Sequence, residues 1–210
     1  EIMKYFGTGK YLARECDLAY NATQMALQWD ALATGDTRIM LTAQAALYDK
    51  PFGTSWITYT RCHDDIGLGY DDKMITDSGY DPYEHRKFIK DYYSGNFEGS
   101  AAKGALFSVN DKNGDARISG SLASLCGLEY AIENKDTDAL ESAIKKIVLM
   151  QAHSFFIGGI PMIFYGDEQG YTNDYSYLQD KSKDYDNRWM HRPLIDWNKN
   201  KNAFIAGTVE

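Results

Sequence analysis

The chain has 210 residues, of which 44% are hydrophobic and 14% aromatic, and its formal net charge is −8. This length suits one ordinary domain or a large part of a bigger one, and the acidic balance argues against a nucleic-acid partner, because phosphate binding needs clustered Lys and Arg. No apolar run reaches the roughly 18 residues that a membrane helix needs, and the longest, at 157–165, has only the length of a strand. We therefore expect a folded protein with neither a nucleic-acid nor a membrane partner.

The first third of the chain predicts helices followed by a strand. Residues 22–33 carry apolar side chains at helical spacing, and residues 37–48 repeat the pattern with Asp36 as a candidate N-cap. A run of β-forming residues at 56–60 leads into a polar sequence at 61–65. We interpret this run as a buried strand that is followed, at its carboxyl end, by a polar cluster.

The middle of the chain differs in character. Residues 66–120 are rich in Gly, Asp and Tyr and lack long helical periodicity. Within them, residues 106–109 and 116–119 flank an Asn-Gly turn and predict a β-hairpin. The region thus differs from the more regular segments on either side of it.

The last part of the chain predicts helices and then a second strand. Residues 121–133 and 137–156 have helical patterns, and two glycines end the second of them. Residues 160–165 then predict another buried strand, which exits through Asp167 and Glu168. The remaining residues to about 193 are polar, aromatic and typical of a loop.

Metal binding is not indicated by any of these patterns. Asp111, Asn113 and Asp115 superficially resemble a calcium loop, but the glycine is misplaced and the twelfth position is Leu122. The three cysteines show neither a zinc pattern nor a disulfide framework, and the histidines lack ligand spacing. We assign no metal and no cofactor.

Two buried strands separated by helices, each followed by carboxylates, predict a parallel sheet in an α/β fold. In a (β/α)₈ barrel the functional groups lie at the carboxyl ends of the strands, so a barrel accounts for both acidic clusters. A doubly wound sheet is the alternative. No glycine-rich phosphate loop supports it, since residues 7–10 lack the full spacing of such a loop.

The sharpest chemical signal is the pair His63-Asp64 at the predicted strand end. A carboxylate beside an imidazole can bind adjacent hydroxyls of a sugar, and a carboxylate also stabilises a developing oxocarbenium ion. The structural alternative is a capped strand end with a histidine that has no role in chemistry.

Residues 59–67, which read Tyr-Thr-Arg-Cys-His-Asp-Asp-Ile-Gly, resemble the seventh-strand motif of glycoside hydrolase family 13, the α-amylase family. The greatest likeness is to the amylosucrase and sucrose hydrolase group. Further segments that agree in order are 20–34, 79–100, 114–120, 158–168 and 187–193. The resemblance thus spans nearly the whole chain.

The resemblance implies a role for five residues. Asp64 matches the carboxylate that binds the sugar and stabilises the transition state, and His63 matches its neighbour in the same subsite. Asp65 and Arg117 match positions on the acceptor side of the pocket. Arg188 matches an arginine that pairs with an upstream acid to close the pocket floor. For both arginines, a purely structural ion pair is the alternative, and the place of Asp167 and Glu168 in the family is mostly structural.

The resemblance also implies a partial (β/α)₈ TIM barrel, comprising about strands six to eight with their helices and an insertion after strand seven. The corresponding division is a barrel segment at 1–65, an inserted subdomain at 66–120 and a second barrel segment at 121–210. Both ends look cut, and the nucleophile and general acid are expected before Glu1. We therefore expect this chain alone to be inactive.

The resulting hypothesis is a fragment of a retaining α-glucoside-processing enzyme, either a hydrolase or a glucosyltransferase. Its partner would be a small carbohydrate such as sucrose, a maltooligosaccharide or an α-glucan. The alternative is a non-catalytic carbohydrate-binding or scaffold protein that keeps the barrel, and catalytic carboxylates on strands four and five would distinguish the two. An open three-stranded remnant has unpaired edges, so the isolated chain is expected to self-associate.

Overall fold

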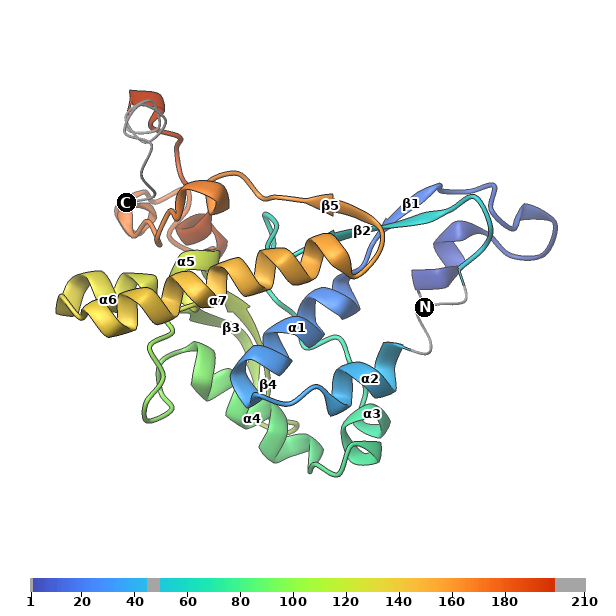
Figure 1. Cartoon of the computed structure of the whole chain (residues 1–210), viewed down its shortest axis with the longest axis horizontal. Coiled ribbons are helices and arrows are strands. Elements are labelled where there is room, and N and C mark those ends of the chain that lie inside the picture. The colour runs from blue at the N-terminus through green and yellow to red at the C-terminus, as the bar shows by residue number, and fades with distance from the viewer. Residues whose placement is uncertain (1, 45–49, 199–210) are drawn as a thin grey trace.

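The central feature of the fold is a three-stranded parallel sheet (Figure 1). The computed structural model describes residues 2–44 and 50–198. The strands, in spatial order, are β1 (Leu18–Tyr20), β2 (Ser55–Tyr59) and β5 (Ile160–Met162). Parallel neighbours need long crossover connections, and both connections here contain helices. The predicted α/β chain with a parallel sheet is confirmed.

The longest helices, α1 (Ala22–Thr34) and α7 (Thr137–Phe156), lie on the same side of this sheet (Figure 1). Each begins at a side chain that accepts a hydrogen bond from a free backbone N–H: Asn21 caps α1 and Asp136 caps α7. Helix α7 contacts α1, β2 and β5. The predicted helices at these two places are confirmed.

The helix predicted at 37–48 is observed as α2 (Arg38–Gln44), and residues 45–48 of that prediction lie outside the described ones. The Asp36 carboxylate accepts a hydrogen bond from the Arg38 N–H at 2.8 Å, as expected near a helix start. The chain begins with a short 3-10 helix, η1 (Ile2–Phe6), which is followed by η2 (Gly9–Tyr11).

The region 66–120 contains more helix than its sequence indicated. It holds α3 (Asp72–Asp77), α4 (Pro82–Tyr93) and a hairpin of β3 (Ala105–Asn110) with β4 (Asp115–Ser119). The hairpin prediction is confirmed. The prediction that this region has no long helix is wrong, since α4 has 12 residues. Its buried stripe consists of His85, Arg86, Ile89 and Tyr93, so polar members hide the pattern from a count of apolar residues.

The single helix predicted at 121–133 is interrupted. It forms α5 (Leu122–Leu125) and α6 (Leu128–Asn134), separated by Gly127 with φ of 95°. Only glycine adopts this backbone conformation easily, and a Cβ at this position would lie 2.9 Å from the Ala101 Cβ. The chain after β5 is mostly loop, with the short 3-10 helices η4 (Asp167–Gln169), η5 (Ser176–Gln179) and η6 (Asn187–His191).

The strand predicted at 160–165 is shorter and more exposed than expected. Only three of these residues form β5, and Ile160 is 48% exposed. The reason is position, because β5 lies at an edge of the sheet as described, whereas β2 is central and buries Trp56 and Tyr59. Apolar residues are also exposed along α7, where Val148, Leu149 and Phe156 face outward.

The larger of two buried apolar clusters joins α1, α4, the hairpin and α5, while Phe6, Ala19 and Trp56 form the smaller one. Trp29 of α1 packs edge-on against Tyr93 of α4, with 5.3 Å between ring centroids, and its indole N–H donates to the Thr60 carbonyl at 2.9 Å. Ile118 of the hairpin and Leu122 of α5 belong to the same buried cluster. The division into two barrel segments and an inserted subdomain stays a prediction.

Candidate functional site

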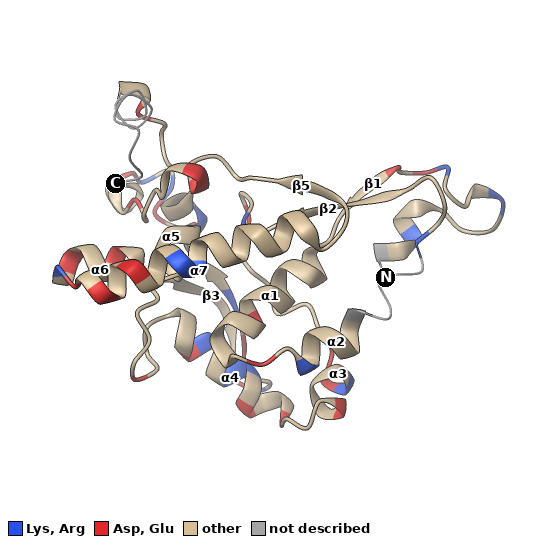
Figure 2. Ribbon diagram, in the orientation of Figure 1, with Lys and Arg blue, Asp and Glu red and all other residues tan. Residues whose placement is uncertain are grey.

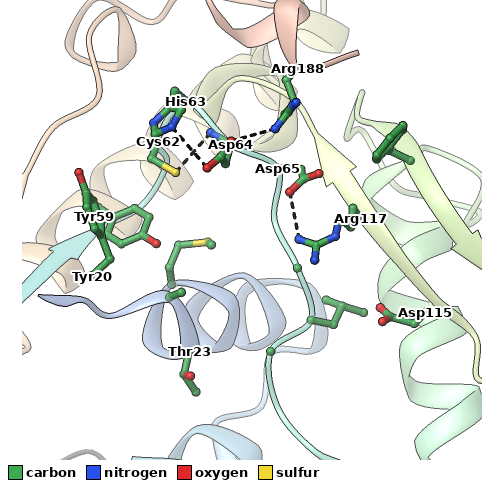
Figure 3. Close-up of a pocket in the computed structure, with 16 residues that line it drawn as sticks. Tyr20, Thr23, Tyr59, Cys62, His63, Asp64, Asp65, Asp115, Arg117 and Arg188 are labelled. Atoms are coloured by element: carbon green, nitrogen blue, oxygen red, sulfur yellow. Dashed lines mark hydrogen bonds and ion pairs between the residues drawn. The ribbon is translucent and has the colours of Figure 1, made fainter. Parts of the chain in front are cut away.

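A pocket of about 740 Å³ opens at the carboxyl end of β2 (Figure 3). The three strands of the sheet carry no charged residue, and the first charged residue after β2 is Arg61 (Figure 2). The structure brings all five residues predicted for the site to the wall of this pocket: His63, Asp64, Asp65, Arg117 and Arg188. Their roles stay predictions.

Asp64 is the most connected of these residues. Its Oδ1 accepts a hydrogen bond from Arg188 Nη1 at 3.0 Å, and its Oδ2 lies 3.4 Å from His63 Nε2. Arg192 Nη2 is 3.9 Å from the same Oδ1. The Asp64 side chain is still 49% exposed, so a ligand in the pocket can reach its carboxylate.

Asp65 and Arg117 form a second ion pair, with 3.2 Å between Asp65 Oδ1 and Arg117 Nη1. The Asp65 side chain is 9% exposed and that of Arg117 is 55% exposed, so the guanidinium extends over the carboxylate toward solvent. Gly67 leaves room for it, because a Cβ at this position would lie 3.2 Å from Arg117 Nη1. The pair joins the segment after β2 to strand β4.

Arg188 does not depend on Asp64 alone for its orientation. Asp186, which caps η6, accepts two further hydrogen bonds from its guanidinium, from Nε and from Nη2, each at 2.8 Å. The hydrogen bonds from Arg188 lower the pKa of Asp186 below its usual value. Among the described residues, Asp186 and Asp64 are thus the carboxylates that hold Arg188, and Asp186 was missed by the sequence reasoning. Its two-residue spacing from Arg188, at the start of a turn, is the signal that could have found it.

Aromatic residues form a further part of the pocket wall that the sequence did not assign. Tyr20 and Tyr59 pack edge to face with 5.3 Å between ring centroids, and Phe107 of the hairpin is 45% exposed. Flat aromatic faces suit the apolar faces of sugar rings. Asp115 also lines the pocket, and its Oδ1 is buried without a hydrogen-bond partner.

The second acidic cluster does not line this pocket. Asp167 is only 6% exposed, and burial raises the pKa of its carboxyl from 3.8 to about 7. Glu168 accepts a hydrogen bond from the Gly166 N–H at 2.8 Å, which is a local turn contact. Neither residue lines the pocket, and the structural role expected for both stays a prediction.

Two of the other histidines make hydrogen bonds inside the protein, away from the pocket. His85 bonds to Asp30 at 2.5 Å with both side chains 3% exposed, and His153 bonds to Gln28 at 3.1 Å. Across residues 2–44 and 50–198, no three His, Cys, Asp or Glu side chains gather as a metal site would require. None of the helices described in these ranges has the length and apolar character needed to cross a membrane.

No known protein-family model matches the chain. Among solved structures, its fold is similar to that of sucrose 6F-phosphate phosphorylase from Thermoanaerobacter thermosaccharolyticum, with a TM-score of 0.59 and 19% sequence identity. The likeness covers 92% of this chain and 33% of that chain, so the chain spans about a third of the length of its structural neighbour. At this identity the likeness shows a shared fold.

Proposed function

We propose that the chain is part of a retaining α-glucoside-processing enzyme of the α-amylase family that acts on sucrose or an α-glucan. The observation that carries the proposal is the placement of Asp64, which lies at the carboxyl end of a central parallel strand, faces an open pocket and is flanked by His63 and Arg188. Carboxyl ends of parallel strands are where barrel enzymes place their reacting groups.

Two features support the barrel as the parent fold. Helices α1 and α7 lie on one side of the sheet, whereas a doubly wound sheet has helices on both faces. The fold is also similar to that of a protein named for its action on a sucrose phosphate. Within this proposal the three strands correspond to strands six to eight of the barrel, and the hairpin with α3 and α4 forms the insertion.

The proposed chemistry is a double displacement. An enzyme carboxylate attacks the anomeric carbon while the glycosidic bond breaks and the leaving oxygen takes a proton from a general acid. Water or an acceptor hydroxyl then attacks the glycosyl–enzyme and returns a proton to the same group. We assign the nucleophile and the acid to strands four and five of the parent barrel, and we assign to Asp64 the electrostatic stabilisation of the positively charged transition state.

The other site residues have supporting roles in this proposal. His63 and Asp64 hold hydroxyls of the glucosyl unit, while Asp65 and Arg117 shape the place of the leaving group or acceptor. Arg188, clamped by Asp186, fixes the Asp64 carboxylate from the far side. Tyr59 offers an apolar wall against which a sugar ring can lie.

The test is release of glucose and fructose from sucrose by a longer form of the protein that extends upstream through the proposed strands four and five. We expect cleavage by this form, loss of activity by at least a hundredfold, or about 2.7 kcal/mol of transition-state stabilisation, in Asp64→Asn, and no activity in the 210-residue chain. Glu168→Gln serves as the matched carboxylate control and should cleave normally.

Other results would redirect or remove the proposal. Cleavage of maltooligosaccharides without sucrose cleavage would keep the family and exclude the sucrose-active group. Binding of sugar without cleavage of any α-glucoside would favour the alternative of a non-catalytic carbohydrate-binding or scaffold protein. Full activity in Asp64→Asn would refute the role of this carboxylate.

A further inference from the structure

Two buried side chains next to His63 and Asp64 have no part in the proposed chemistry. Arg61 and His191 are each 1% exposed. Arg61 donates from Nε to the Gly120 carbonyl and from Nη2 to the Asp64 carbonyl, both at 2.9 Å. His191 accepts a hydrogen bond at Nδ1 from the Gly120 N–H at 3.2 Å, and its Nε2 lies 3.3 Å from the His63 carbonyl.

These contacts tie together the three segments that supply the site. Arg61 follows β2 and belongs to the segment that carries Asp64. Gly120 directly follows β4, the strand of Arg117, and His191 ends η6, the turn of Arg188. Buried polar groups need their hydrogen bonds to be satisfied, so a shift of one segment would break bonds to the other two.

The contacts also fix the position of the proton on His191. Nδ1 accepts from the Gly120 N–H, so it carries no proton, and a neutral ring then carries its proton on Nε2. This Nε2–H donates to the His63 carbonyl, because the neighbouring Arg61 Nη2, at 3.3 Å, cannot accept. Protonation of Nδ1 would place two hydrogen-bond donors, Nδ1–H and the Gly120 N–H, opposite each other. It would also place a cation beside Arg61.

The surroundings of His191 agree with a neutral ring. Burial and the charge of Arg61 lower its pKa from 6.5 to about 2. The charged groups that act on the ring are Arg61 and Arg192, which oppose protonation, and Asp186, which favours it. The two cations and the loss of solvent outweigh the single carboxylate.

We propose that Arg61 and His191 are positioning residues for Asp64, and that His191 fulfils this role as a neutral imidazole protonated on Nε2. The pair holds the backbone carbonyls of His63 and Asp64, so it sets where the Asp64 carboxylate points. The consequence for catalysis rests on the proposed function, whereas the proton position and the contacts can be measured without it.

The first experiment is long-range ¹H–¹⁵N NMR of the histidine rings in the 210-residue chain between pH 5 and 8. The expected spectrum shows His191 as the Nε2–H tautomer with no titration in this range. A ring protonated on Nδ1, or one that titrates between these values, would overturn the proposal whether or not the protein acts on sugars.

The second experiment compares two substitutions that each keep half of the contacts. His191→Gln can keep a donor near the Nε2 position and the bond to the His63 carbonyl. His191→Asn can keep an acceptor near the Nδ1 position and the bond to the Gly120 N–H. His153→Gln, which replaces a half-buried histidine outside the pocket, is the control.

In the longer, sucrose-cleaving form, His191→Asn should lower kcat by about tenfold to a hundredfold with little change in KM, since small misplacements of a reacting group have effects of this size. His191→Gln should recover most of the rate, and the control should match the wild type. Equal rates in all variants, or a loss in His191→Gln as large as in His191→Asn, would contradict a positioning role.

If the protein proves inactive on α-glucosides, the positioning role of His191 can still be tested by NMR. The amide resonances of Asp64 and Asp65 should then shift in His191→Asn and remain near their wild-type positions in His191→Gln. Such a result would support the positioning pair while the proposed function fails. Unchanged resonances in both variants would overturn the pair.

Discussion

Replacing Asp167 by Asn should change how the stability of the folded chain depends on pH. The Asp167 carboxyl is buried and its pKa is raised from 3.8 to about 7, so the folded state holds this proton more tightly than the unfolded state does. Between these two pH values the folded state therefore binds more protons, and the free energy of unfolding falls as pH rises. Asp167 thus destabilises the fold most above pH 7.

The size of this effect follows from the same shift. About three pKa units at about 1.4 kcal/mol each give an upper limit of roughly 4 kcal/mol between pH 4 and pH 7. For a chain of this length, such a difference corresponds to about 10 °C in Tm. Asn has no charge to lose, so the pH slope due to this position should vanish in the variant. Contributions of other groups, such as His191, are present in both proteins and cancel in the comparison.

The assay is thermal or urea unfolding followed by circular dichroism from pH 4 to pH 8, at a fixed low protein concentration because association would add stability. We expect Asp167→Asn to gain stability relative to wild type as pH rises. The charge of the exposed Glu168 is the smallest of the causes that raise the pKa of Asp167, so Glu168→Gln should keep most of the wild-type slope. Parallel curves for Asp167→Asn and wild type would refute the reasoning from burial.

Three further predictions concern backbone strain, the pocket and the exposed surface. Gly159→Ala should destabilise the chain by several kcal/mol more than Gly158→Ala in denaturant unfolding, because a Cβ at Gly159 would lie 2.6 Å from the Trp56 carbonyl oxygen while Gly158 has open space; equal losses would refute this. Asp115→Ala should weaken sugar binding by several-fold in calorimetric titration, because Asp115 lines the pocket and the substitution removes a polar group from its wall; unchanged affinity would exclude a contact. The isolated chain should self-associate through the exposed apolar residues of α7 and the edges of the sheet; a single monomeric species across concentrations in sedimentation would contradict this.

The sequence predicted best where local signals were long and consistent. Helices α1 and α7 have sustained apolar periodicity and capping side chains, and the hairpin has its Asn-Gly turn. Helix α4 was missed because His85 and Arg86 occupy buried positions, where hydrogen bonds and an ion pair replace apolar burial. Strand β1 has only three residues, too few for a periodic pattern, and only the family resemblance pointed to it.

The site was predictable to the extent that its residues lie in recognisable motifs. Asp64 and Asp65 follow a strand, and the resemblance pointed to Arg117 and Arg188, which the fold brings to the same pocket. Asp186 carries no signal other than its nearness to Arg188. The contacts of Arg61 with Gly120 join positions 59 residues apart, and no local pattern encodes such a distance.

The ion pair between Arg188 and Asp64 means that the protein itself supplies a group that competes with a ligand for the Asp64 carboxylate. A sugar hydroxyl that binds Oδ1 of Asp64 must share this oxygen with the Arg188 guanidinium or displace it, and the hydrogen bonds to Asp186 would still hold the arginine. Both side chains of the pair are more than a third exposed, so dissolved ions weaken their attraction. Binding of an uncharged sugar, which should ordinarily ignore ionic strength, would here become tighter as salt is added.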